Sequence, residues 1–306
     1  MTLDDLRSLI AVHESESFSA AARRLGCSQP AVSQHIQRLE QELGLQLFER
    51  RARGVSPTAA GELLARAASE SLGALDRAVH QFASLREGDA GSLTIATGGT
   101  TVHHFLRNAI KAFRRAYPRV KLQLRGAAST AECIEALRFE PVDLAFVTIG
   151  EPLDGVRQRA LLELDYVLLA GRDHPLARRS KLRLTDLQGL ECIDLIEGRT
   201  SRSQLAGALA REGVIIESAM TVYDWDTAIE LVELGLGSAI VPSWHARAST
   251  GRAALVAIPI AGLPPIRVGW AVRDSYALLK PARELMRLLR AELRARPAQP
   301  GVRVLA

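Results

Sequence analysis

Residues 21–61 of the chain read AARRLGCSQPAVSQHIQRLEQELGLQLFERRARGVSPTAAG, and this stretch decides the fold of the first part of the molecule. A short run of helix-forming residues ends at Gly26, and a tight turn follows. Ser28-Gln29-Pro30 then begins a second helical run, because serine caps helix N-termini and proline is tolerated in the first turn. Two helices joined by a tight turn predict a helix-turn-helix unit.

The second helical run has two unlike faces. Its apolar residues recur at helical spacing, as expected of a face that packs on a core, and are Val32, Ile36, Leu39 and Leu43. Neutral hydrogen-bonding side chains form the other face and are Gln29, Ser33, Gln34 and Gln37. Glutamine can pair with adenine through two hydrogen bonds, and serine can donate or accept one, so this face suits the edges of DNA bases. A merely solvated helix is the alternative.

A basic segment follows the second helix. Residues 49–57 read ERRARGVSP, with Arg50, Arg51 and Arg53 bounded by glycine and proline. A loop of this composition beside a base-reading helix can lay guanidinium groups along phosphates or in a minor groove. Arginine clusters are more often solvated charge runs, but the position of this one favours contact with DNA.

Residues 21–61 resemble the winged helix-turn-helix signature of LysR-type transcriptional regulators. The shared features are Ala-Ala-x-x-Leu, Ser-Gln-Pro-Ala-Val-Ser, Leu-Glu, Leu-Phe-x-Arg and Thr-x-x-Gly. The resemblance implies a reading helix over about 29–40 and a wing over about 47–56. By resemblance, the base and groove contacts are Gln29, Pro30, Ser33, Gln34 and Arg53, with Arg50 near a phosphate. From their place at the start and on the polar face of the helix, Ser28 and Gln37 are expected to contact DNA as well. At Gln34, many relatives carry a basic residue instead.

Thr58 is expected to cap a long helix whose apolar residues approach the repeat of a coiled coil. These residues are Leu64, Ala68, Leu72, Leu75, Val79 and Phe82. Roughly thirty helical residues rise about 45 Å, which is more than one globular core covers. We therefore expect two copies of the chain to dimerise through this helix, with packing on the chain's own C-terminal part as the alternative. A polar segment with two glycines, residues 86–92, ends the helix.

Composition excludes several classes of protein. The chain has 306 residues, enough for about two domains, and 47% of them are apolar. Apolar runs are too short for a membrane span, the acidic N-terminus is unlike a secretory signal, and three distant cysteines do not form a disulfide framework. We therefore expect a cytoplasmic protein without membrane association. The net charge of +5 is not concentrated in the part of the chain expected to bind DNA, because residues 1–91 carry 10 Lys and Arg against 12 Asp and Glu.

After residue 92 the pattern changes to short strands that alternate with helices, which predicts β-α-β units in an α/β domain. A strand and a long helix follow a second such set, so the chain should return to the first of two lobes that flank a cleft. Residues 173–177, 184–187 and 235–242 extend the resemblance to LysR-type regulators. The resemblance implies a periplasmic-binding-protein-like effector domain with two Rossmann-like halves, and hence an α + α/β fold for the whole chain.

These patterns predict three parts of the chain. The parts are a winged helix-turn-helix over 1–57, a linker helix and hinge over 58–91, and an effector domain over 92–306. One lobe of the effector domain should comprise about 92–164 and 266–306, and the other about 165–265. The tail after Arg296 is expected to be disordered or loosely packed.

Ligands of open α/β sheets bind beyond the carboxyl ends of strands, where helix N-termini offer free amides. Hydroxyl side chains lie at such positions and are Thr100, Thr101, Ser129, Thr148 and Thr200. Arg199 and Arg202 are candidate partners of an anion, and Trp225 is a candidate wall. Each hydroxyl alone could simply cap a helix. Their convergence favours a pocket for a small carboxylate or another anion, with an aromatic compound as the alternative.

The residues also bear on rival functions. No nucleophile–base constellation or cofactor fingerprint occurs, so neither an enzyme nor a bound cofactor is expected. His103-His104 has no third residue at zinc-ligand spacing, so no metal site is expected. We predict a transcriptional regulator that binds double-stranded operator DNA and a small-molecule effector and forms homodimers through the linker helix. Tetramers follow from the resemblance, and a solute-binding protein without a transcriptional role is the alternative.

Overall fold

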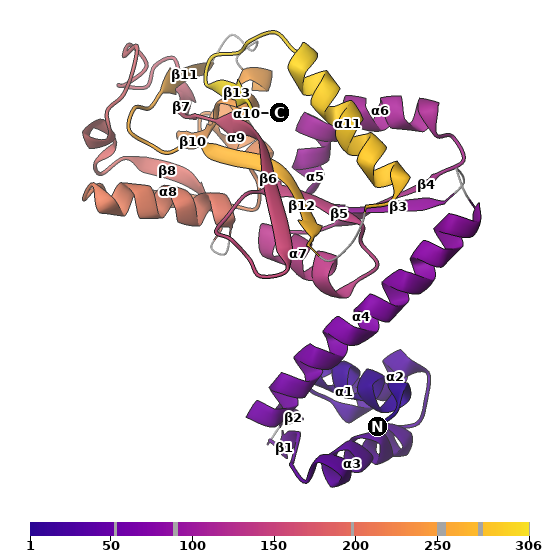
Figure 1. Cartoon of the computed structure of the whole chain (residues 1–306). Helices are drawn as coiled ribbons and strands as arrows, with labels where there is room; N and C mark the ends of the chain where they lie inside the picture. The colour runs from indigo at the N-terminus through magenta and orange to yellow at the C-terminus, as the bar shows by residue number, and fades with distance from the viewer. Residues whose placement is uncertain (52–53, 88–90, 197–198, 250–254, 275–277, 306) are drawn as a thin grey trace. The chain divides into compact units, whose positions relative to one another are not determined.

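A computed structural model of the chain describes all residues except 52–53, 88–90, 197–198, 250–254, 275–277 and 306 (Figure 1). The chain divides into two compact units, with the main division between His80 and Gln81. In the part of the chain that is described, no helix is both long and apolar enough to cross a membrane.

Three helices and a hairpin form the first unit. These elements are α1 (Leu3–Ser15), α2 (Phe18–Leu25), α3 (Gln29–Leu43), β1 (Phe48–Arg50) and β2 (Val55–Pro57), and α4 (Ala59–Glu87) follows them. Thr2, Ser17 and Ser28 cap α1, α2 and α3, because each side chain accepts a hydrogen bond from a backbone N–H group. Gly26 and Gly44 end α2 and α3 in the left-handed conformation. The predicted winged helix-turn-helix is confirmed.

The apolar face of α3 packs into the core of this unit. Val32, Ile36 and Leu39 are buried there beside Leu47. Leu43, which was predicted to share this face, is 44% exposed because it is the last residue of α3. β1 and β2 pair antiparallel along their whole length and form the wing.

Six strands form the main sheet of the second unit, in the order β13-β6-β12-β5-β3-β4. They are β3 (Ser92–Thr97), β4 (Lys121–Gly126), β5 (Leu144–Thr148), β6 (Val156–Leu164), β12 (Ile266–Arg273) and β13 (Val302–Val304). β3 pairs parallel with β4 and β5, as β-α-β units require, whereas β12 pairs antiparallel with β5 and β6. This sheet and its helices form the first subdomain of the unit.

The helices of the first subdomain connect these strands and cover the sheet. They are α5 (Gly99–Thr101), the π-helical η2 (Val102–Leu106), α6 (Arg107–Ala116), α7 (Thr130–Phe139) and α11 (Lys280–Ala295). α6 and α11 lie side by side (Figure 1), and Asn108 of α6 donates a hydrogen bond to Glu292 of α11 at 3.1 Å.

The second subdomain contains a three-stranded sheet in the order β10-β7-β11 and a parallel pair, β8 and β9. Its elements are β7 (Tyr166–Gly171), η3 (Leu184–Leu187), β8 (Glu191–Leu195), α8 (Thr200–Arg211), β9 (Glu217–Val222), α9 (Trp225–Glu233), β10 (Ala239–Pro242), α10 (Ser243–Ser249) and β11 (Leu255–Pro259). The chain crosses between the subdomains twice, from β6 to β7 and from β11 to β12. One apolar cluster reaches into both subdomains and includes the fully buried side chains of Tyr166 and Trp270.

The expectation of a loosely packed tail after α11 is wrong. β13 adds to the main sheet beside β6, with Val302 opposite Leu164. The side chain of Val302 packs against the central apolar cluster. The sequence did not indicate this pairing because β6 itself carries charged and apolar residues without a clear strand alternation.

Candidate functional site

The N-terminal half of α3 presents the side chains predicted to read DNA bases. Ser28, Gln29, Pro30, Gln34 and Gln37 are exposed, and Ser33 is half-buried. The hydroxyl of Ser28 accepts a hydrogen bond from the backbone N–H of Ala31 at 3.4 Å, so it also caps the helix. The predicted residues therefore share one accessible end of α3.

A buried carboxylate anchors α3 to α1. Asp5 of α1 is fully buried, and its Oδ1 lies 3.2 Å from Nδ1 of His35 and 3.6 Å from a guanidinium nitrogen of Arg38, both on α3. Burial alone would raise the pKa of Asp5, but hydrogen bonds from Thr2 and the nearby Arg38 and His35 hold it below its usual value. Sequence reasoning missed this cluster, because its members lie on two separate helices.

The wing carries the basic side chains beside α3. Arg50 is exposed at the end of β1, and the Nε of Arg51 donates to the hydroxyl of Ser56 at 2.8 Å. Arg53, predicted as a groove contact, lies outside the described residues. The rings of Phe18 and Phe48 meet edge to face with centroids 6.1 Å apart, which packs the wing against α2.

The start of α4 is fixed by the Thr-x-x-Gly segment. The hydroxyl of Thr58 donates to the carbonyl of Gln46 at 2.7 Å and accepts from the backbone N–H of Gly61 at 3.1 Å. A Cβ atom at Gly61 would collide with the carbonyl oxygen of Leu47, so only glycine fits this close approach. Thr58 therefore caps α4 as predicted.

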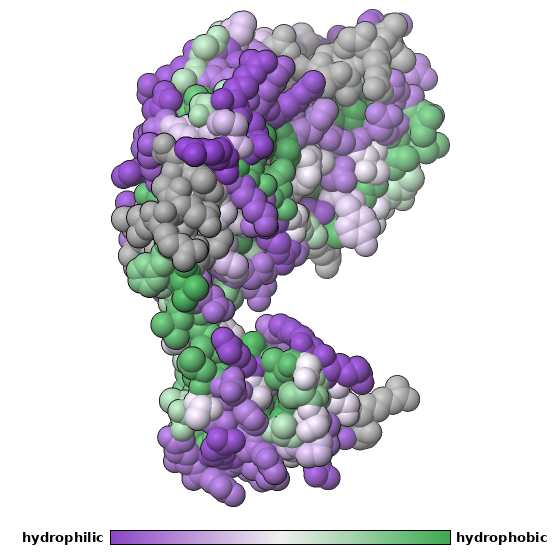
Figure 2. Space-filling view, turned by 90° about the vertical axis from the view of Figure 1, so that its right-hand side faces the viewer, coloured by the Kyte–Doolittle hydropathy of each residue, from purple (hydrophilic) through white to green (hydrophobic). Residues whose placement is uncertain are grey.

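The predicted seam of α4 divides into two parts. Ala68 is buried in the core of the first unit and Leu72 is 8% exposed, whereas Leu75, Val79 and Phe82 are 53%, 67% and 67% exposed. Figure 2 shows hydrophobic side chains gathered along the helix beyond the winged domain. The later turns of α4 thus present an apolar stripe to solvent, which is unusual for a helix that stays alone.

A cavity of about 110 Å³ lies between the two subdomains, at the carboxyl ends of β3 and β5. Six of the predicted effector-binding residues line it and are Thr100, Thr101, Ser129, Thr148, Thr200 and Trp225. They come from separate elements, since α5, α7, α8 and α9 all begin beside the cavity. The position agrees with the rule that ligands bind beyond the carboxyl ends of strands.

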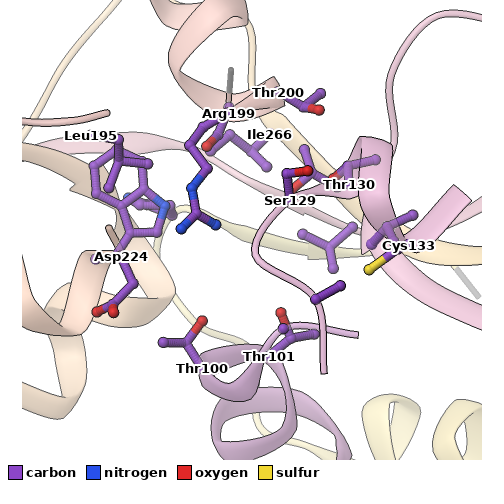
Figure 3. A pocket seen from close by; sticks show the side chains of 18 of the residues that line it. Thr100, Thr101, Ser129, Thr130, Cys133, Leu195, Arg199, Thr200, Asp224 and Ile266 are labelled. Atoms are coloured by element: carbon purple, nitrogen blue, oxygen red, sulfur yellow. The ribbon is translucent and has the colours of Figure 1, made fainter. Parts of the chain in front are cut away.

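Arg202 is the predicted residue that the structure does not bring to the cavity. Its Nε donates to the carboxylate of Asp194 at 2.8 Å, because Arg202 lies within the first turn of α8 beside β8. Arg199 precedes that turn in extended backbone and lines the cavity instead. Figure 3 shows its guanidinium reaching into the space beside Thr100 and Thr101. Among the described residues, no acceptor lies within hydrogen-bonding reach of the Arg199 guanidinium.

The helix starts around the cavity differ in their capping. The hydroxyl of Ser129 accepts from the backbone N–H of Glu132 at 3.1 Å, and the carboxylate of Glu132 accepts from the N–H of Ala128 at 2.7 Å. This backbone hydrogen bond and the neighbouring Arg125 and Arg199 hold the pKa of Glu132 below its usual value. The first turn of α8 has no side-chain cap. Its amide groups, together with Arg199, therefore favour an anion at this end of the cavity.

One histidine lines the cavity with a second one packed behind it, and sequence reasoning missed both. His245 of α10 lines the cavity, and its ring lies 4.4 Å from that of His104 in η2. Burial, together with the neighbouring His104, lowers the pKa of His245 to about 3, so its imidazole is neutral at ordinary pH. Burial also raises the pKa of the Cys133 thiol in the cavity wall to about 12, which makes it unreactive. No group of three metal-ligating side chains occurs among the described residues.

Comparison with known families accounts for both units. Residues 3–62 match the bacterial regulatory helix-turn-helix protein, lysR family, and residues 86–294 match the LysR substrate binding domain. The chain belongs to the LysR family of transcriptional regulators. It is therefore a DNA-binding regulator with an effector-binding domain, and the family is not one of enzymes.

Relatives match this LysR-type regulator over most of its length. The HTH-type transcriptional regulator YnfL of Escherichia coli (strain K12) is 31% identical over 300 residues, which cover 94% of this chain and 96% of the relative. BudR of Raoultella terrigena is 33% identical over 249 residues, which cover 79% and 84%. The crystal structure of full-length CbnR complexed with its target DNA is similar with a TM-score of 0.54 and 26% identity, and the match covers 94% of this chain and 100% of CbnR.

The family match removes the solute-binding alternative for this LysR-type regulator, because the matched helix-turn-helix occupies its first unit. The cavity between the subdomains lies within the matched substrate binding domain. The regulator thus combines a helix-turn-helix domain and a substrate binding domain that contains the cavity.

Proposed function

We propose that this regulator reads its operator through the exposed end of α3. Gln29, Ser33 and Gln34 would contact base edges in the major groove, because amide and hydroxyl groups match the donors and acceptors found there. Ser28, Pro30 and Gln37 would flank these contacts, while Arg50 and Arg53 of the wing would meet phosphates or a minor groove. The exposure of the α3 residues and the anchoring of α3 by Asp5 support this assignment.

The regulator would act as a dimer built on α4. The apolar stripe of Leu75, Val79 and Phe82 supports this arrangement, because a second copy of the helix would cover it. Such a dimer presents two reading helices to neighbouring turns of the operator. Pairing of dimers into tetramers would use the second unit, where β4 is an edge strand with Leu124 46% exposed.

The effector would be a small anion, with a carboxylate favoured. The observation that carries this proposal is Arg199, whose guanidinium lies in the cavity without a described hydrogen-bonded partner. The uncapped start of α8 adds amide donors, and Thr100 and Thr101 add hydroxyls. The small cavity volume favours a compact ligand. An aromatic carboxylate is the alternative, because Trp225 lines the cavity and could pack against an aromatic ring.

The effector would control DNA binding by shifting a population of lobe arrangements. Thr100 and Arg199 belong to different subdomains, so a ligand held by both favours the arrangement in which they approach. The domain limits that go with this mechanism are 1–57, 58–91 and 92–306, with lobes of about 92–164 plus 266–306 and about 165–265. The separate sheets of the two subdomains support the division into lobes. A regulator of this kind would work on DNA in the cytoplasm.

Thermal unfolding of the full chain with a panel of small aliphatic and aromatic carboxylates tests the effector class. A binder should stabilise the protein by about 2.7 kcal/mol at a hundredfold excess over its Kd. Arg199→Gln should weaken that binder about tenfold to a hundredfold, because a hydrogen bond to a charged group contributes about 1.5–3 kcal/mol. Arg211→Gln, at the exposed far end of the same helix, is the matched control. Equal affinity in both variants would place the effector elsewhere.

A further inference from the structure

The segment of residues 297–305 that follows α11, named here the hinge strap, joins parts of both subdomains. Its strand β13 pairs with β6, and the backbone N–H of Leu305 donates to the carbonyl of Leu161 at 2.8 Å. One residue before β13, the carbonyl of Gly301 accepts hydrogen bonds from the N–H of Asp165 at 2.8 Å and from the hydroxyl of Ser243 at 2.6 Å. The strap therefore holds the first subdomain along β6 and the second subdomain at the start of α10.

The contacts of Gly301 lie at a crossing between the subdomains. Asp165 is the single residue between β6 and β7, where the chain leaves the first subdomain. Its carbonyl accepts a hydrogen bond from the backbone N–H of Ser243 at 2.8 Å. Gly301, Asp165 and Ser243 thus form a closed set of backbone and hydroxyl hydrogen bonds around the hinge.

The fit at this point requires glycine. Gly301 has φ +71°, in the left-handed region, and a Cβ atom there would lie 2.9 Å from both Cβ and Oγ of Ser243. Any larger side chain must push the strap away from α10. The close approach of the strap to Ser243 therefore depends on glycine at position 301.

Side chains on both flanks reinforce the strap. Arg303 of β13 donates to the carboxylate of Glu163 on β6 at 3.0 Å. Before the strap, the guanidinium of Arg296 lies 4.6 Å from the ring of Trp244, and this ring lies 5.0 Å from that of Phe105 in η2. α10 is consequently held from one side by the residues after α11 and from the other by η2.

The strap touches the immediate neighbours of residues that line the cavity. Leu164 lines the cavity and pairs with Val302 of the strap. Pro242, which precedes Ser243, and His245 of α10 also line the cavity. The strap itself lies beyond residue 294, where the match to the LysR substrate binding domain stops. The strap residues that support the cavity wall thus lie outside the part of the chain that the family model covers.

We propose that the hinge strap braces the crossing between the subdomains and so limits how far they open around the effector cavity. Gly301 and Ser243 are positioning residues in this account, because they act on the cavity through Asp165 and α10. The consequence for effector binding rests on the function proposed above. The effect of the strap on the separation of the subdomains is measured without any effector. A negative result there would leave the proposed effector class untouched, and the reverse also holds.

Distances between spin labels on the full chain test the proposal. Labels at Glu135→Cys on α7 and Ala206→Cys on α8, both exposed positions, report the separation of the subdomains. The background carries Cys27→Ser, since Cys27 is exposed while the other cysteines are buried. Labelled chains are diluted with unlabelled ones, so that only distances within one chain are read.

Two variants disturb the strap and one matched variant does not. Removal of residues 297–306 deletes the strap, and Gly301→Val displaces it from Ser243. Gly213→Val is the control, because Gly213 has φ +68° but no atom within 4 Å of its Cβ position, so it carries the backbone strain alone. Circular dichroism establishes that each variant is folded, and Ser243→Ala replaces any strap variant that does not fold.

We expect one narrow distribution of the distance between the two labels for the parent and for Gly213→Val. Both strap variants should give a broader distribution that extends to longer distances. A parent-like distribution in the folded strap variants would overturn the proposal. Equal broadening in Gly213→Val and Gly301→Val would also overturn it, because backbone strain rather than the strap contact would then be the cause.

Discussion

The Nε2 atom of His104 lies 2.7 Å from the Oδ1 atom of Asp226, and this hydrogen bond links the two subdomains near the cavity between them. His104 belongs to η2, and its side chain is only 7% exposed. Asp226 lies in the first turn of α9. Burial alone would raise the pKa of Asp226, but the bond to His104 and the nearby His245 and His103 hold it below its usual value. The pair is therefore a second link between the subdomains, separate from the strap.

A double-mutant cycle should reveal the coupling between these two side chains. His104→Phe keeps a ring but removes the donor, and Asp226→Ala removes the acceptor. Because Asp226 is partly exposed, solvent screening should reduce the coupling free energy to about 1 kcal/mol, below the usual range for a hydrogen bond to a charged group. Urea unfolding of the four proteins measures it. His103→Phe with Asp226→Ala is the control cycle, and a coupling of the same size there would contradict the assignment.

Stability should depend on pH through His245. The unfolded chain takes up a proton at this residue near pH 6.5, whereas the folded chain does not until about pH 3. The unfolded state therefore binds more protons between these values, and stability falls as the pH is lowered, by up to about 1.4 kcal/mol per pH unit for one group. His245→Gln should lose this part of the slope. Identical slopes for parent and variant between pH 7 and pH 5 would show that His245 does not stay neutral in the fold.

Base reading should depend on the N-terminal half of α3. Gln29→Ala and Ser33→Ala should each cost about 1–3 kcal/mol at the specific site and relax the choice of base there. Gln41→Ala is the control, since Gln41 is also exposed on α3 but lies near its C-terminal end. Gel-shift titrations at fixed salt give the affinities. Losses equal to that of the control would mean that α3 does not read the operator.

Dimerisation should depend on the exposed part of the α4 seam. Leu75→Asp places a carboxylate in the proposed helix pair, and its burial without a partner disfavours association. Leu75 is a better test site than Leu72, because Leu75 is 53% exposed and Leu72 only 8%. Leu63→Asp alters an exposed leucine outside the seam of the same helix. Sedimentation equilibrium should give dimers for the parent and for Leu63→Asp, and monomers for Leu75→Asp; dimers in all three would exclude this seam.

The first unit could be predicted almost fully from the sequence, because its information is local. The spacing of Val32, Ile36 and Leu39 sets the buried face, and Ser28 sets the helix start. The contact of Asp5 with His35 could not be predicted in this way. It depends on how α1 crosses α3, which residue spacing along one helix does not encode.

The cavity between the subdomains could be predicted only in outline. Hydroxyls at strand ends indicated the cavity, because the topology of parallel strands brings those ends together. The choice between Arg199 and Arg202 needed the direction of the first turn of α8, and the sequence leaves that direction open. The pairing of His104 with Asp226 joins residues that are 122 positions apart, and β13 joins β6 across a similar distance. Long-range contacts of this kind follow from the packed fold and have no local signature.

Selection of binding sites from random duplex DNA by the full chain tests the central claim most directly. The claim is that the chain is a sequence-specific DNA-binding regulator that reads its operator through paired α3 helices. It predicts strong enrichment of an inverted repeat, with half-sites separated by whole turns of the duplex, because two-fold related reading helices require such symmetry. The same selection with Gln34→Ala should enrich a repeat that is degenerate at one position of each half-site. Recovery of no sequence above the starting pool, or of a motif without repeat symmetry, would contradict the account.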